Sequence, residues 1–135
     1  MRLRIWPGKR ELKTGRFQKR WQELQKLLSN KENWAEVIKN ADKLLDEALR
    51  KKRIRGKNMG ERLVQAQRIL SDNDGVWFGH KLRTKLDADP DAALKESDVK
   101  NALVGIRQAL KDLGALPASI SQAAKDTEKG SANAK

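Results

Sequence analysis

Residues 34–49 read WAEVIKNADKLLDEAL, and this stretch decides the fold class. Its apolar side chains recur at intervals of three and four residues, the spacing that places them on one face of an α-helix. They form a wide stripe, the kind that is buried on several sides in a bundle: Trp34, Val37, Ile38, Ala41, Leu44, Leu45, Ala48 and Leu49. We therefore predict an all-α protein with a central helix over residues 31–53.

Apolar patterns on both sides of this stretch extend the bundle. Further helices are predicted at 11–28, at 59–70 and at 75–86, and a fifth is capped by Ser97 and ends at Gly114. Gly56 is the expected stop of the central helix. Because the loops are short, the predicted fold is an up-and-down bundle of four to five helices. Core packing is the predicted role of the aromatic residues Trp21, Trp34, Trp77 and Phe78.

The length of 135 residues suits one domain with one core. We place the bundle at 11–116, after a basic flexible arm at 1–10 (MRLRIWPGKR) that a Pro-Gly turn ends. Trp6 in this arm is expected to fold back onto the domain, and stacking on a base is the alternative. Residues 117–135 have no usable period and are rich in Ala, Ser, Lys and Gly, which predicts a flexible tail.

Several function classes are disfavoured by composition. The chain has no cysteine, so disulfides and thiolate metal sites are excluded, and a cytoplasmic location is expected. Its apolar runs are far too short to span a bilayer. Asp87, Asp89, Asp91 and Asp98 have the spacing of calcium ligands, but Pro90 lies inside the loop, and Ala92 stands at the sixth position, where a calcium loop needs glycine for its sharp turn. We assign these aspartates to caps and turns and predict no metal and no cofactor.

Positive charge is concentrated in two blocks. The formal net charge is +12; residues 1–31 carry ten Lys and Arg against two acids, and residues 50–70 carry eight against one. Such blocks favour binding to a polyanion, such as RNA or an acidic protein. The predicted phosphate contacts are Lys13, Arg16, Lys19, Arg20 and Lys26 in the first block and Arg50, Lys51, Lys52, Arg53, Arg55 and Lys57 in the second.

Two stretches resemble a known family. They are the helix-turn-helix at 34–63 (WAEVIKNADKLLDEALRKKRIRGKNMGERL) and the segment at 76–91 (VWFGHKLRTKLDADPD), which is followed by a helix closing in DLGAL. In this order they resemble the HEPN family, the small helical domains named for higher eukaryotes and prokaryotes nucleotide-binding. The resemblance implies a two-fold homodimer with the motif helices at its interface. In active members, paired Arg and His side chains form a metal-independent ribonuclease site.

The match is incomplete at the residues that carry catalysis. Arg83 matches the family's motif arginine and Thr84 its polar position. The position of the motif histidine falls near Ala88, where this sequence has no histidine. The single histidine, His80, precedes the arginine. His80, Arg83 and Asp87 share a helix face, where they could form a hydrogen-bonded or ion-paired cluster with Asp87 or another acid. The resemblance therefore implies a degenerate member rather than an active enzyme.

The sequence leads us to expect a non-catalytic basic helical module that binds RNA or another polyanion. Two alternatives remain open. One is a protein-interaction module that pairs with an acidic partner or with a nucleotidyltransferase, a common companion of HEPN domains. The other is a metal-independent ribonuclease that uses Arg83 and His80.

Overall fold

The computed structural model describes residues 11–117, and this range is helical with no strand. The all-α prediction is therefore confirmed for this part of the chain. The predicted arm at 1–10 and all but the first residue of the predicted tail lie outside the described residues. The elements are α1 (Thr14–Leu27), a 3-10 helix η2 (Lys31–Asn33), α2 (Trp34–Lys51), α3 (Met59–Gln65), α4 (Asn73–Ala88) and α5 (Glu96–Asp112).

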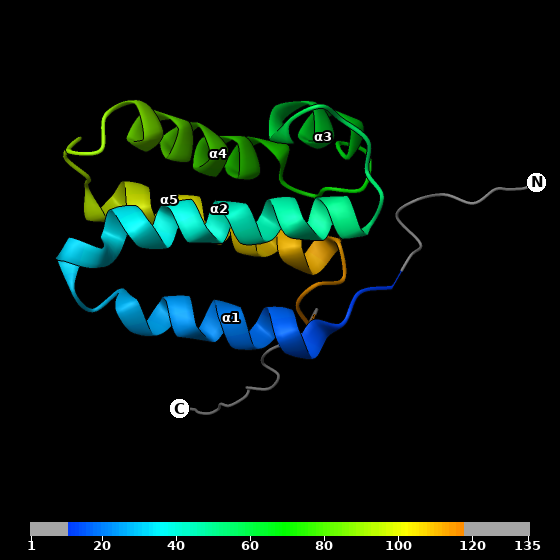
Figure 1. Ribbon diagram of the computed structural model, residues 1–135, viewed down its shortest axis with the longest axis horizontal. Helices are drawn as coiled ribbons and strands as arrows, with labels where there is room; N and C mark the ends of the chain where they lie inside the picture. The colour runs from blue at the N-terminus through cyan, green and yellow to red at the C-terminus, as the bar shows by residue number, and fades with distance from the viewer. Residues whose placement is uncertain (1–10, 118–135) are drawn as a thin grey trace, which may run out of the picture.

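Figure 1 shows that the four long helices alternate in direction along the chain. α2 lies between α1 and α4, and α5 runs behind α2. α2 contacts each of the other three long helices, while α4 packs most extensively on α5. Short α3 covers the end of α2 beside the start of α4.

The core follows the apolar stripe of residues 34–49. From Val37 to Leu49 its apolar side chains are at most 1% exposed. Apart from exposed Val104, the apolar positions of α5 from Val99 to Leu110 are buried against it, and α1 contributes Phe17 and Trp21. Phe78 differs from its predicted packing role, since it is 39% exposed.

The end of α2 differs from the prediction and has a clear local cause. The helix ends at Lys51, and Arg53 takes the left-handed conformation with φ of 63°. The N–H of Ile54 then donates to the carbonyl of Leu49 at 3.0 Å, which closes a Schellman motif. Ile54 is 7% exposed, so its burial fixes the stop ahead of Gly56.

Other helix ends agree with the sequence to different degrees. Gly114 ends α5 with φ of 81°, as predicted, but α5 begins after Lys95, so Ser97 lies inside the helix and does not cap it. α3 stops at Gln65, earlier than expected. α4 begins earlier, because the Asp72 side chain accepts a hydrogen bond from the third helical N–H at 3.0 Å.

Glycines bring α4 unusually close to α5. A Cβ on Gly105 of α5 would collide with the backbone carbonyl of Gly75, and a Cβ on Gly79 would come within 2.9 Å of Ile106. Both contacts need a bare backbone, so the two helices are tightly seated. No helix within residues 11–117 is long and apolar enough to cross a membrane.

Candidate nucleic-acid interface

The antiparallel packing of α1 and α2 brings the two basic blocks together. The start of α1 lies beside the end of α2 (Figure 1), and cations from both helices surround one carboxylate, Glu47. Arg20 Nη1 lies 2.6 Å from Glu47 Oε1, and Arg16 Nη2 lies 3.5 Å from Oε2. Arg16 and Glu47 line a shallow surface depression together with Arg50 and Lys51. We call Arg16, Arg20, Arg50 and Lys51 the basic site.

Glu47 is the electrostatic centre of the basic site. Burial alone would raise its pKa, but the hydrogen bond from Arg20 and the charges of Arg20, Arg16 and Lys51 outweigh burial, so the pKa lies below its usual value. The carboxylate is therefore ionised at neutral pH and neutralises one positive charge. Arg50 Nε also lies 3.5 Å from Asp46 Oδ2, so two acids flank the four cations and the basic site keeps a net positive charge.

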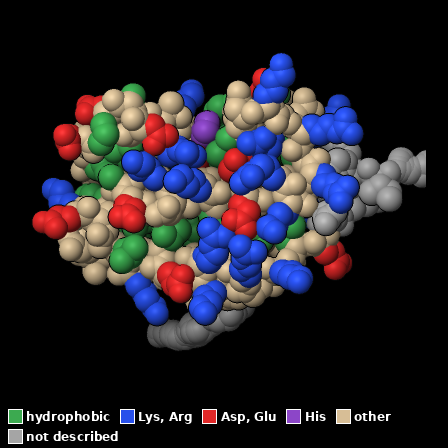
Figure 2. Space-filling view, in the orientation of Figure 1, with side chains coloured by type: hydrophobic (Ala, Val, Ile, Leu, Met, Phe, Trp, Pro, Cys, Tyr) green, Lys and Arg blue, Asp and Glu red, His purple; other side chains and the backbone are tan. Residues whose placement is uncertain are grey.

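Further cations extend this surface without internal partners. Lys13, Arg53, Arg55 and Lys57 are exposed, and their side chains have no ion pair within residues 11–117. In Figure 2, Lys and Arg side chains gather over the half of the visible face where α2 ends, with a few acids between them. Unpaired exposed cations remain available to an anionic partner at little desolvation cost.

Three predicted cations lie elsewhere. Lys52 is not part of this surface: it is 6% exposed, and burial lowers the pKa of its ammonium group, an effect that nearby Glu11 opposes. Its neighbours Lys51 and Arg53 are exposed, whereas Lys52, just after the end of α2, lies on the core side. Lys19 and Lys26 are exposed, but helical spacing puts them on the side of α1 opposite buried Phe17.

Arg62 is an arginine that the sequence reasoning did not single out. Its guanidinium donates two hydrogen bonds to the Asp46 carboxylate, at 2.7 and 3.0 Å, and one to the carbonyl of Gly56 at 2.8 Å. Only 13% of its side chain is exposed. It fixes the loop that carries Arg53 and Arg55 against α2. No local sequence signal distinguishes this arginine from its neighbours, because its partner lies sixteen residues away.

The motif residues of α4 meet on a buried carboxylate of α2. His80 Nδ1 lies 2.8 Å from Asp42 Oδ2, and Arg83 Nη1 lies 3.3 Å from the same oxygen. Asp42 is fully buried, and its other oxygen has no hydrogen-bond partner in the described chain. Arg83 Nε also donates to Asp87 at 3.0 Å. Thr84 Oγ1 donates to the His80 carbonyl at 3.0 Å.

This cluster has the geometry of an interhelical tie. His80 and Arg83 of α4 both face Asp42, and the Arg83 guanidinium is divided between Asp42 and Asp87. Lys39 of α2 lies 3.9 Å from Asp87 and adds a second link between the helices. A buried carboxylate requires such partners, because an unpaired buried charge costs several kcal/mol. Phosphate binding by Arg83 would have to compete with two internal carboxylates.

No group of three or more His, Cys, Asp or Glu side chains within residues 11–117 is arranged to hold a metal ion. Comparisons with protein-family models, with curated proteins and with solved structures give no match to this chain. The HEPN resemblance, and the homodimer that it implies, therefore stay predictions from the two sequence stretches.

Proposed function

We propose that this chain is a non-catalytic helical module that binds RNA through the phosphate backbone. The observation that carries the proposal is the convergence of two basic blocks, distant in sequence, at the paired ends of α1 and α2. The blocks supply the basic site and the unpaired cations beside it. Phosphate contacts of this kind give affinity and orientation but little sequence specificity.

The chemistry of the basic site favours the backbone over the bases. Arginine forks match the two oxygens of a phosphate, and three of the four cations are arginines. None of the side chains that line the depression is aromatic, so it offers no stacking platform for bases. The resemblance to nucleotide-binding helical domains supports RNA as the polyanion. An acidic protein is the second candidate partner, and it would use the same cations.

A ribonuclease using His80 and Arg83 is less well supported. Both side chains are engaged by buried Asp42, and Arg83 is further held by Asp87. A phosphate would have to displace these contacts. We therefore assign His80, Arg83 and Asp87 to the packing of α4 on α2, with Thr84 capping the carbonyl of His80.

The test is fluorescence polarisation of a short labelled single-stranded RNA across a salt series, followed by a denaturing gel of the same samples. Each neutralised phosphate contributes about 0.7 to the slope of log affinity against log salt for a single strand. With one of its four charges neutralised by Glu47, the basic site alone predicts a slope of about −2, with intact RNA on the gel.

Other outcomes would contradict the proposal in different ways. A flat salt response would remove phosphate neutralisation as the source of affinity. If the parent chain cleaves the RNA and Arg83→Ala leaves it intact, the ribonuclease would be favoured. Co-purification of an acidic protein that survives nuclease treatment, in the absence of RNA binding, would favour the protein-interaction module.

A further inference from the structure

A pocket of about 330 Å³ opens between α1 and α5, on a different side of α1 from the basic site. α1 packs mainly on α2, which leaves its contact with α5 incomplete. Apolar side chains dominate the lining, including Trp21, Trp34 and Leu103. Its volume falls in the range of small-molecule sites, which are mostly apolar with a few directed polar groups.

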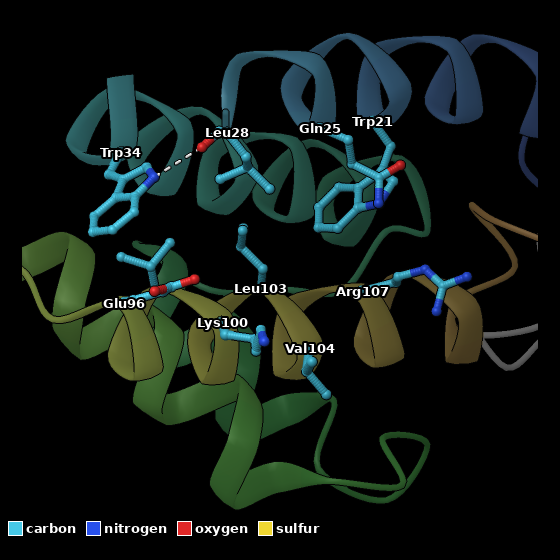
Figure 3. A pocket seen from close by; sticks show the side chains of 10 residues that line it. Trp21, Gln25, Leu28, Trp34, Glu96, Lys100, Leu103, Val104 and Arg107 are labelled. Carbon is cyan, nitrogen blue, oxygen red and sulfur yellow. Dashed lines mark hydrogen bonds between the residues drawn. The ribbon is translucent and has the colours of Figure 1, made fainter. Parts of the chain in front are cut away.

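The two ends of the pocket differ in charge. Figure 3 shows Trp34 and Glu96 at one end, and Trp21 and Arg107 at the other. The indole of Trp34 is held in place, because its Nε1 donates to the carbonyl of Leu28 at 3.0 Å. An elongated ligand would therefore meet a negative charge at one end and a positive charge at the other, with the cation Lys100 also lining the pocket between them.

Two hydrogen-bond donors at the Arg107 end lack partners. Trp21 is 5% exposed, and its Nε1 is buried with no acceptor in the described part of the chain. Arg107 is half-buried, has no ion pair within residues 11–117, and has a pKa lowered by burial. Buried donors are nearly always satisfied in folded proteins, and a partly desolvated arginine without a carboxylate is costly. The Trp21 Nε1 is shielded from the pocket, so an anionic acceptor bound there would partner Arg107.

We propose that this pocket binds a small apolar molecule that carries one carboxylate, with the carboxylate at Arg107 and the apolar body against Trp34 and Leu103. Glu96 at the far end disfavours a second acidic group there. The pocket is thus selective for monoanions over neutral and dianionic molecules of the same shape. It is separate from the RNA-binding proposal, which uses cations of α1 and α2.

The test compares two fluorescent probes of nearly the same shape on the full chain. Anilinonaphthalene sulfonate is an apolar aromatic monoanion whose sulfonate stands in for the carboxylate, and N-phenylnaphthylamine is its neutral analogue. Arg107→Gln removes the positive charge and keeps a donor. We expect it to weaken the anionic probe about tenfold, or about 1.4 kcal/mol, and to leave the neutral probe within about twofold.

Two further variants separate the pocket from general effects. Arg68→Gln removes a cation from an exposed position on another part of the chain and is expected to leave both probes unchanged. Val104→Trp fills the mouth of the pocket at a side chain that is 60% exposed, so folding tolerates it, and both probes should lose affinity. Circular dichroism verifies that each variant is folded.

The proposal is overturned if Arg107→Gln and Arg68→Gln weaken the anionic probe equally, since binding would then reflect net charge. It also fails if Arg107→Gln weakens the neutral probe as much as the anionic one, or if Val104→Trp leaves both unchanged. The RNA affinity of Arg107→Gln is measured as well, because Arg107 lies outside the basic site. We expect it to equal that of the parent chain, so the two proposals can fail independently.

Discussion

Glu47→Gln is the single change that should strengthen RNA binding. The carboxylate lies between Arg20 and Arg16 and neutralises part of their charge. Glutamine keeps the shape and one hydrogen-bond acceptor but removes the negative charge. The basic site then presents one more net positive charge to the RNA.

The size of the effect follows from counterion release. One additional neutralised phosphate steepens the salt slope by about 0.7, which corresponds to about fivefold higher affinity at about 0.1 M salt. The ion pairs that are lost join a partly buried carboxylate to two solvent-accessible arginines, and their loss costs about 1 kcal/mol of folding free energy. The variant should therefore remain folded while its RNA affinity rises.

Asp91→Asn is the matched control for this prediction. It removes the same charge from an exposed residue in the loop between α4 and α5, next to the opposite end of α2. At about 0.1 M salt the Debye length is about 10 Å, so this charge should barely affect the basic site. Fluorescence polarisation of both variants against the same RNA checks the prediction. Equal gains in the two variants, or no gain in Glu47→Gln, would refute the reasoning.

Glu47→Gln also changes the acid dependence of folding. Because the folded-state pKa of Glu47 is lowered from 4.5, the carboxylate stabilises the fold above that pH. This stabilisation is lost as the pH falls below 4.5 and through the lowered pKa. Urea unfolding at neutral and acidic pH should therefore show a smaller acid-induced loss of stability in Glu47→Gln than in the parent chain.

Three further changes test how the fold is held. Arg53→Gly should stabilise the chain by about 1 kcal/mol in urea unfolding because glycine takes the left-handed conformation without strain, whereas Arg55→Gly should give no gain. Gly105→Ala should destabilise the chain by about 3 kcal/mol, because its Cβ would collide with the backbone of α4. Gly15→Ala, where a Cβ meets open space, should be neutral or stabilising by up to about 1 kcal/mol. If thermal unfolding ranked the two variants in the reverse order, the close packing of α5 on α4 would be contradicted. Asp42→Ala should cost about 3 kcal/mol by leaving His80 and Arg83 without their shared partner, and a neutral effect would argue against the interhelical tie.

Regular amphipathic spacing made the helices predictable. Residues 37–49 carry their apolar side chains on one face, and this pattern is decisive wherever one face is buried. Two helix ends also follow from residue type: Gly114 provides the left-handed stop of α5, and the Asn58 side chain caps α3 by accepting a hydrogen bond from the N–H of Glu61 at 2.9 Å. These features depend on neighbours in the sequence alone.

Features that depend on tertiary packing escaped prediction. The run at 50–57 contains six cations, and nothing in it indicates that Lys52 turns inward while the residue after it adopts a positive φ. The positive φ accompanies the burial of Ile54, whose N–H closes the turn on Leu49. The carboxylate that pairs with His80 lies 38 residues away on another helix, so only the packed bundle reveals it.

The most direct test of the central claim compares two double variants of equal charge. Arg50→Gln with Lys51→Gln removes two cations from the basic site, and Arg68→Gln with Lys95→Gln removes two exposed cations outside it. In the Arg50/Lys51 double variant, the slope of log affinity against log salt should become about 1.4 units less steep, and RNA affinity at about 0.1 M salt should fall about twentyfold. In the Arg68/Lys95 double variant, both quantities should change little. Equal losses in both variants would mean that net charge alone attracts RNA, and would contradict a defined interface at the paired ends of α1 and α2.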